Sequence, residues 1–221
     1  MIQPVATVPL ERCSTVMISE AARKRRITAY HEAGHAALHL ALGVQFTKVT
    51  IIPNEDYLGA VHGCSLLLPS PDDNPERFCV LTPEMKSNID REILIFLGGP
   101  LAEHRFLGKE WLRLNFYDLE GYSPPDLAEV SRLGEYLLEP EDEELNEIKR
   151  YEEAFHDGEP LDRLYYNEGT TPSLENQIDD QLKGHLQIAQ NLVEINWPRI
   201  ERLAQALLKR RELTQDEAAS L

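Results

Sequence analysis

Cysteine is scarce in this sequence, and its scarcity excludes two classes of small protein. Only Cys13, Cys64 and Cys79 occur among 221 residues, and no two of them stand in a C-x-x-C spacing. A disulfide-stabilised scaffold needs more cysteines than this, and a zinc ribbon needs closely spaced pairs. The cysteine usage therefore indicates a protein of a reducing compartment.

Positive charge and long apolar runs are also lacking. The 22 lysines and arginines are outnumbered by 38 aspartates and glutamates, which gives a net charge of −16. Surfaces that bind nucleic acid or anionic lipid are basic, so we expect neither partner. The longest apolar stretches, 36–44 and 93–102, are far shorter than the ~20 residues that cross a bilayer. The first residues are neither basic nor strongly apolar, so we expect no signal peptide, no membrane span and a cytoplasmic location.

The remaining composition is that of an ordinary globular protein, with 42% hydrophobic and 27% charged residues. The length fits one domain, or one domain with a small appendage, because domains usually contain about 100–200 residues. We divide the chain into an N-terminal arm (1–18), a core (19–138), a strongly acidic insertion or linker (139–172) and C-terminal helices that pack on the core (173–221).

Hydrophobic periodicity predicts a mainly α-helical protein with one small β-sheet, an α+β fold. Apolar positions three to four residues apart, bounded by capping residues, predict helices, and β-branched runs predict strands. The expected helices cover 19–42, 82–107, 123–137, 173–196, 197–208 and a short turn from Thr214, and the expected strands cover 48–53 and 58–68. Gly98-Gly99-Pro100 lies inside the second helix, where such a triplet indicates a kink, a break, or a close approach by another element.

The strongest chemical signal is His31-Glu32-Ala33-Gly34-His35, an HExxH motif inside the first predicted helix. Residues four apart lie on one helix face, about 5–6 Å apart at Cβ, so both imidazoles can reach one tetrahedral metal ion. Glu32 then lies beside the open coordination position, where it can take a proton from bound water. We therefore predict a Zn²⁺ site with His31 and His35 as ligands.

A catalytic zinc site needs a third protein ligand, and the residue pattern leaves its identity open. His39 is two helical turns from His31, about 11–12 Å, so it cannot bind the same ion and is expected to pack in the core. The longer HExxHxxGxxH motif is absent, because positions 38 and 41 are Leu and Ala. Two carboxylates remain, Glu103 after the Gly-Gly-Pro triplet and Asp126 after Ser-Pro-Pro, and spacing alone does not choose between them.

Several segments resemble, in the same order, the peptidase domain of the FtsH family of zinc proteases. Thr28–Ala36 (TAYHEAGHA) resembles the family's catalytic helix, and Leu97–Glu103 (LGGPLAE) resembles its LGGRxAE helix. The other similar segments are Lys48–Pro53, Leu58-Gly59, Asp126-Leu127 with Leu133, and 197–214. The resemblance covers roughly residues 20–138 and 175–217.

This resemblance implies a zincin-type peptidase core whose Zn²⁺ ligands are His31, His35 and Asp126. It implies Glu32 as the general base, and Glu103 as a residue that supports a ligand or as the alternative third ligand. The implied activity is that of a soluble metallo-endopeptidase that hydrolyses peptide bonds of extended or unfolded polypeptide. Members of the family assemble as hexamers, so a homo-oligomer, or a separate ATPase partner, is also implied.

Departures from the family pattern support a second hypothesis. The sequence has no GxxxxGK[ST] motif, we expect no membrane anchor, and Ser-Pro-Pro-Asp stands where the family has Gly-Ala-Ser-Asn-Asp. The alternative is a non-catalytic FtsH-like adaptor or assembly subunit that binds zinc but docks on a partner protease. Glu32, which an adaptor does not need, favours the peptidase. A different soluble HExxH peptidase would share the zinc and the base, but not the segments Lys48–Pro53 and Leu97–Glu103. For a peptidase, we expect an extended substrate to add to the sheet at 61–67.

Overall fold

The computed structural model describes residues 19–63, 66, 82–109, 119, 124–137 and 174–221. The predicted arm 1–18, the acidic segment 139–172, the three cysteines, and the predicted substrate-binding edge beyond Gly63, apart from Leu66, lie outside the described residues.

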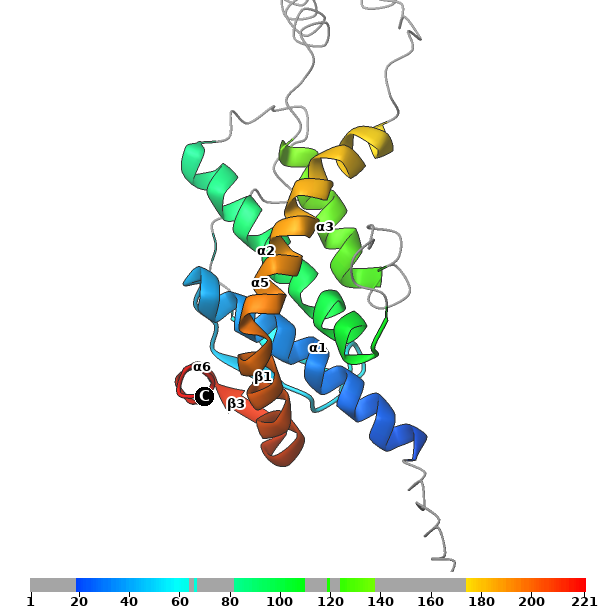
Figure 1. The fold of residues 1–221 in the computed structure, drawn as a ribbon. Helices are drawn as coiled ribbons and strands as arrows, with labels where there is room; N and C mark the ends of the chain where they lie inside the picture. Colours follow the sequence, from blue (N-terminus) through cyan, green and yellow to red (C-terminus); the bar gives the residue numbers. More distant parts are fainter. Residues whose placement is uncertain (1–18, 64–65, 67–81, 110–118, 120–123, 138–173) are drawn as a thin grey trace, which may run out of the picture.

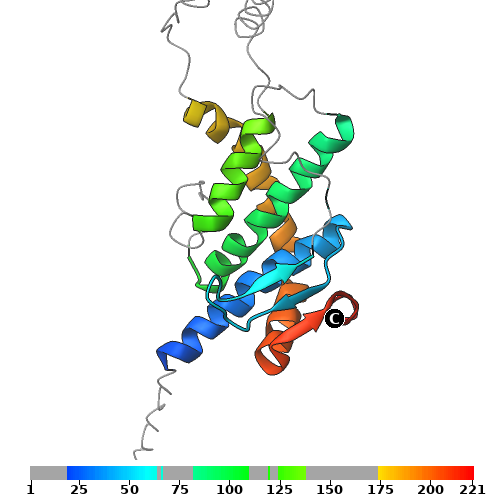
Figure 2. The same ribbon diagram turned by 180° about the vertical axis from the view of Figure 1, so that it is seen from behind.

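Long helices and one small sheet make up the described part of the chain, which confirms the predicted α+β class. Helix α1 (Glu20–Leu42) packs against both α2 (Pro83–Phe106) and α5 (Leu174–Arg210), and α3 (Pro124–Leu137) packs against α2 (Figure 1). The sheet lies along α1, as the reverse view shows (Figure 2). In these described residues, no helix combines the length and the apolar character of a membrane span.

Capping residues set the predicted helix ends. The Ser19 hydroxyl accepts a hydrogen bond from the backbone N–H of Ala22 at the start of α1, and Gly43 ends that helix with a φ of 68°. Thr82 caps α2 in the same way, and Pro83 follows it at the first helical position, where its missing N–H costs nothing.

The sheet contains three antiparallel strands in the order β2-β1-β3. Strands β1 (Lys48–Thr50) and β2 (Ala60–His62) fall within the predicted strands but are shorter, whereas β3 (Glu212–Thr214) was not predicted. Strand β3 contains only one apolar residue, which is too few to produce the alternating apolar and polar pattern of a strand. Arg211, with a φ of 68°, turns the chain from α5 directly into this strand.

Helix α5 runs without interruption from Leu174 to Arg210, so the prediction of a new helix at Trp197-Pro198 was wrong. A proline inside a helix removes one hydrogen bond and costs about 3 kcal/mol. Tertiary packing offsets this cost, because Trp197 stacks on Tyr30 with ring centroids 5.7 Å apart, and the Arg105 guanidinium lies 4.3 Å from the Trp197 ring centroid. Buried apolar residues continue on the same face of α5 on both sides of the proline.

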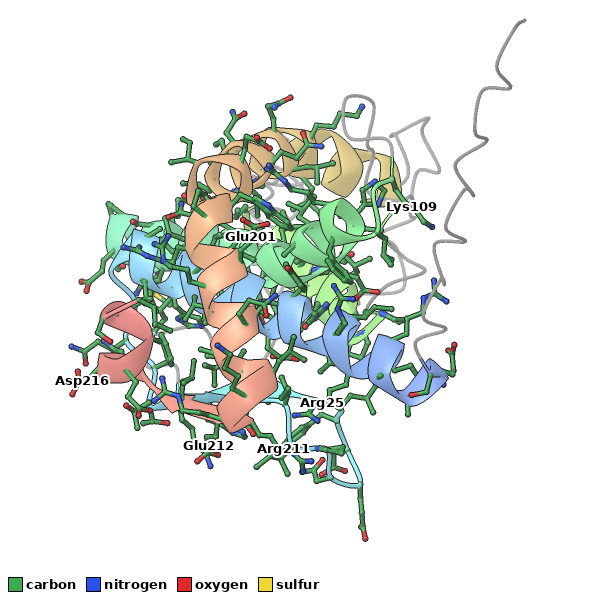
Figure 3. All side chains as sticks on the ribbon, turned by 60° about the horizontal axis from the view of Figure 1, so that its bottom comes forward. Arg25, Lys109, Glu201, Arg211, Glu212 and Asp216 are labelled. Carbon is green, nitrogen blue, oxygen red and sulfur yellow. The ribbon has the colours of Figure 1, made fainter. Side chains whose placement is uncertain are left out.

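The far end of α5 is also tied to α1 and to the sheet. The Arg25 guanidinium donates a hydrogen bond of 2.8 Å to the carbonyl oxygen of Leu208, where α5 is running out of internal donors (Figure 3). Lys48 on β1 pairs with Glu212 on β3 at 2.8 Å. These contacts hold the C-terminal strand beside β1.

Helices α1 and α2 cross at a contact between glycines. A Cβ atom placed on Gly34 would lie 2.2 Å from the carbonyl oxygen of Gly98, so only glycine allows this approach. Helix α2 is continuous through Gly98-Gly99-Pro100. The triplet therefore marks a close approach by another element, one of the three alternatives that the sequence left open.

We expect Gly34→Ala to lower the free energy of unfolding of the metal-free protein by about 1–3 kcal/mol, because the added methyl group forces α1 and α2 apart. Urea unfolding followed by circular dichroism measures this change. The control is Gly184→Ala on α5, where a Cβ meets nothing within 4 Å. That variant should gain roughly 0.5–1 kcal/mol from helix propensity. Equal stability of the two variants would contradict the prediction.

Candidate metal centre

Helix α1 presents His31 and His35 on one face, one turn apart, as the motif predicts. Their Nε2 atoms are 3.1 Å apart, and both rings are largely buried. Two imidazole nitrogens at this separation face a common point.

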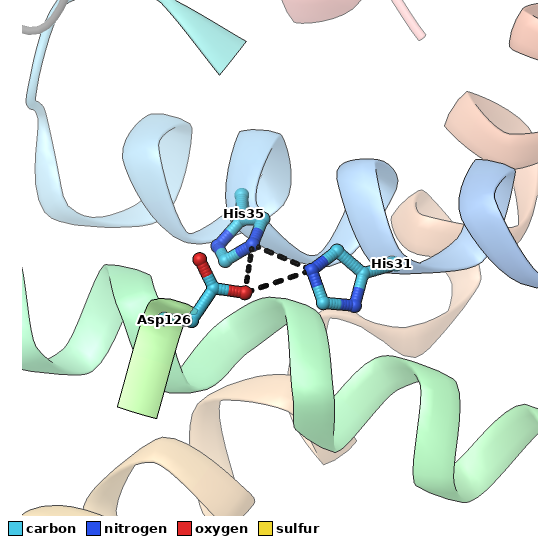
Figure 4. A group of neighbouring side chains, drawn as sticks. All are labelled: His31, His35 and Asp126. Carbon is cyan, nitrogen blue, oxygen red and sulfur yellow. Dashed lines mark hydrogen bonds and ion pairs between the residues drawn. The ribbon is translucent and has the colours of Figure 1, made fainter. Parts of the chain in front are cut away.

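Asp126 from the first turn of α3 completes the group (Figure 4). Its Oδ2 atom lies 2.9 Å from Nε2 of His31 and 3.4 Å from Nε2 of His35. One ligand atom from each of the three residues falls within 4.8 Å of the others. The two nitrogens and one carboxylate oxygen are a donor set that suits Zn²⁺ and leaves a fourth position open.

The second nitrogen of each ring is held by α2. Nδ1 of His35 donates to the carbonyl oxygen of Ile95 at 2.8 Å, and Nδ1 of His31 lies 3.2 Å from Oε2 of Glu103. A carbonyl can only accept, so the proton of neutral His35 is on Nδ1 and its Nε2 lone pair is available to a metal. Glu103 therefore contacts the outer side of His31 and is not part of the converging group.

The charges of the centre favour a bound cation. Burial opposes protonation of His31, but its bonds to Asp126 and Glu103 outweigh this and raise its pKa from 6.5 to about 10. Burial likewise opposes protonation of His35, and the Asp126 carboxylate again prevails and raises the pKa. Burial alone would raise the pKa of Asp126, but the two histidines bring it well below its usual range. In the metal-free protein, protons bound to the two histidines balance the negative charge of the neighbouring carboxylates.

Glu32 lies beside this group and is 6% exposed. Burial raises the pKa of its carboxyl group, while His31 and His35 lower it in part. A Cβ atom on Gly59 would lie 2.7 Å from Cγ and 2.8 Å from Oε1 of Glu32. The backbone that leads into β2 therefore passes very close to this side chain. A buried carboxylate with a raised pKa suits proton transfer near neutral pH.

Strand β2 forms one edge of the sheet, and within the described residues no strand pairs with its outer side. Leu58, just before this strand, is 67% exposed. Of the predicted substrate-binding edge at 61–67, the structure describes only Val61, His62, Gly63 and Leu66.

Among the described residues, the group of potential metal ligands includes no histidine other than His31 and His35. His39 is buried against Phe46, and burial, with a smaller effect of His35, lowers its pKa to about 4, so it packs as a neutral side chain. His185 on α5 pairs with Asp90 on α2 at 2.9 Å. Sequence patterns could not reveal this pair, because the two residues are 95 positions apart in the chain.

Two histidines one helical turn apart, a carboxylate from another helix and a buried glutamate next to the first histidine define a metallopeptidase-type centre. Comparison with known proteins points to a family. Residues 17–115 match peptidase family M41. The chain is similar to zinc metalloproteases of the FtsH family, as its motifs predict.

Individual relatives extend the similarity along nearly the whole chain. The ATP-dependent zinc metalloprotease FtsH 2 of Methylacidiphilum infernorum is 26% identical over 96% of this chain and 30% of its own length. The ATP-dependent zinc metalloprotease FtsH of Acidobacterium capsulatum is 26% identical over 94% of this chain and 30% of its own length. That of Sulfurovum sp. is 40% identical over 39% of this chain and 12% of its own length. The chain thus spans less than a third of the length of these relatives.

We expect zinc binding to strengthen as the pH rises. The pKa of His31 is about 10 without metal, so its Nε2 must lose a proton before it can bind zinc. Below that pKa, each released proton makes the affinity rise about tenfold per pH unit. Competition with a chelator of known proton affinity, at pH values from about 6 to 9, measures this slope. In Glu103→Gln the increase in zinc affinity should level off at a lower pH, because this variant lacks one of the carboxylates that raise the pKa of His31. An affinity independent of pH would contradict the prediction.

Proposed function

We propose that this protein is a zinc-dependent endopeptidase that cleaves extended or unfolded polypeptide. His31, His35 and Asp126 bind the zinc, and Glu32 is the general base. The observation that carries this proposal is the convergence of two Nε2 atoms and one carboxylate oxygen, with each histidine held from behind through Nδ1. Histidines and carboxylates that do not share a ligand are not expected to converge in this way.

Each residue has a distinct task in the proposed reaction. Zinc held by His31, His35 and Asp126 would act as a Lewis acid, which polarises a carbonyl group and lowers the pKa of water. Glu32 takes the proton from the attacking water and passes it to the nitrogen of the leaving amine, which its raised pKa favours. Glu103 fixes the ring of His31, and the carbonyl oxygen of Ile95 fixes that of His35.

The edge of β2 is the proposed binding surface for the substrate. An extended polypeptide can add to an unpaired strand edge through main-chain hydrogen bonds, which do not depend on its sequence. The contact between Gly59 and Glu32 supports this assignment, because it brings a chain aligned on β2 close to the base. A folded protein presents no such free segment, so unfolded polypeptide is the expected substrate.

The proposal includes the organisation of the chain and its partners. Residues 19–138 form the zinc peptidase core, 173–221 pack on it, and 1–18 and 139–172 are an arm and an acidic insertion. The relatives are named ATP-dependent, but a chain that accepts already extended substrates needs no ATP for the cleavage itself. We place the protein in the cytoplasm on its cysteine usage, and assembly into a homo-oligomer, or with an ATPase partner, belongs to the same proposal.

We expect Glu32→Gln to reduce cleavage of casein, without ATP, by at least about 100-fold, since the general base is lost. Zinc content should stay unchanged, because Glu32 is not a ligand. Glu20→Gln is the matched control, as Glu20 is exposed in the first turn of the same helix. Cleavage by Glu32→Gln at the rate of the parent would refute the assigned base. A zinc-loaded parent that cuts nothing would favour the adaptor hypothesis.

The third ligand can be identified by comparing two carboxylate variants. We expect Glu103→Gln to weaken zinc binding by about 10–100-fold, the usual cost of losing a group that orients a ligand. Asp126→Asn should weaken it further, because a charged ligand is removed. Asp216→Asn, on the exposed first turn of α6 (Gln215–Ala219), should have no effect. Equilibrium zinc titration ranks the variants, and a larger loss in Glu103→Gln than in Asp126→Asn would make Glu103 the ligand.

A further inference from the structure

We propose that Gly99 is a positioning residue of the metal centre, and that the absence of its side chain leaves the space in which the ion is held. This inference rests on the proposed zinc site and assigns a task to a residue that binds nothing. It comes from the geometry of the α2 backbone opposite the two histidines.

A side chain on Gly99 would enter the space between the histidine rings. Its Cβ atom would lie 2.2 Å from Nε2 and 2.6 Å from Cε1 of His35, and 2.7 Å from Nε2 of His31. Zinc binds histidine nitrogen at about 2.0–2.1 Å. The volume that a methyl group would fill at residue 99 therefore overlaps the volume that an ion on both Nε2 atoms must occupy. The ribbon of α2 passes beside the two rings in Figure 4.

The adjacent glycine has a different environment. A Cβ atom on Gly98 would lie 3.0 Å from the carbonyl oxygen of Gly34 and 3.0 Å from Cδ2 of Leu38, and neither atom belongs to the metal centre. Successive residues of a helix point about 100° apart, so one glycine faces the crossing with α1 and the other faces the histidines. Gly98 serves the packing of two helices, whereas Gly99 keeps open a space that packing does not need.

The cost of this arrangement supports the assignment. Glycine disfavours a helix, and two glycines followed by a proline inside α2 disfavour it strongly. Alanine at 99 would improve the propensity of α2, and its methyl group would meet only the ends of two imidazole rings, which can turn away by giving up their hydrogen bonds to α2. The metal-free fold should therefore tolerate Gly99→Ala, and the penalty should fall on metal binding.

The test compares zinc binding in Gly99→Ala and in the control Gly184→Ala with the parent. We expect Gly99→Ala to bind zinc at least ~100-fold more weakly than the parent. This is the upper end of the loss that follows removal of a group that orients a ligand. The variant should also lose the visible absorption of tetrahedral Co²⁺, while the far-ultraviolet circular dichroism of the metal-free protein stays unchanged. Gly184→Ala should retain both zinc binding and the Co²⁺ spectrum. A helix-packing role for Gly99 would not produce a selective loss of that spectrum.

Three results would overturn the inference. The first is zinc affinity in Gly99→Ala within about threefold of the parent, below the effect of losing even an outer partner of a ligand. The second is loss of helical structure in metal-free Gly99→Ala, because the methyl group would then act on the fold. The third is absence of zinc binding in the parent. If the parent and Gly184→Ala bind zinc but cleave no casein, the peptidase proposal fails, while the loss of zinc in Gly99→Ala still supports the task of Gly99.

Discussion

The close contact between α1 and α2 at Gly34 and Gly98 is the constraint on which the metal centre depends. It brings the α2 backbone near enough for the Ile95 carbonyl and the Glu103 carboxylate to contact the two histidines of α1. The orientation of each ring is thus determined by the neighbouring helix and not by its own. Separation of the two helices would release both rings together, so the packing of the core and the geometry of the centre form one system.

Electrostatics gives the same group of residues a second property. Glu32, Glu103 and Asp126 surround two imidazoles in a largely buried space, and this excess of negative charge must be balanced. Protons balance it in the metal-free protein, as the raised pKa of His31 shows, and a divalent cation can replace them. Binding of the ion releases these protons and adds to the stability of the folded state, because the assembled site is absent from the unfolded chain.

Local sequence signals predicted the helix that carries the HExxH motif and its ends, because Ser19 and Gly43 act within one turn of the chain. They failed where distant residues decide. Pro198 argues for a helix break, but the packing of Trp197 on α1 outweighs it, and β3 is too short to have a pattern of its own. The choice between Glu103 and Asp126 was equally inaccessible to spacing, since they lie 72 and 95 residues from His31. Only the family resemblance pointed to Asp126, and the fold shows that it faces the histidines while Glu103 contacts one of them from behind.

The connectivity of the sheet has a consequence for how the protein is made. On one side of the sheet, hydrogen-bonded residues such as Thr47 and His62 are 15 apart in sequence, whereas Lys48 and Glu212, which are hydrogen-bonded on the other side, are 164 apart. The half that contains β2 can form early from local contacts, and the half that joins β1 to α5 must await a chain segment synthesised much later. Loop-closure entropy grows only slowly, by about 0.6 kcal/mol for each doubling of the loop. The intervening chain can therefore vary widely in length during evolution at little cost in stability. Such variation changes mainly the time at which the sheet is completed.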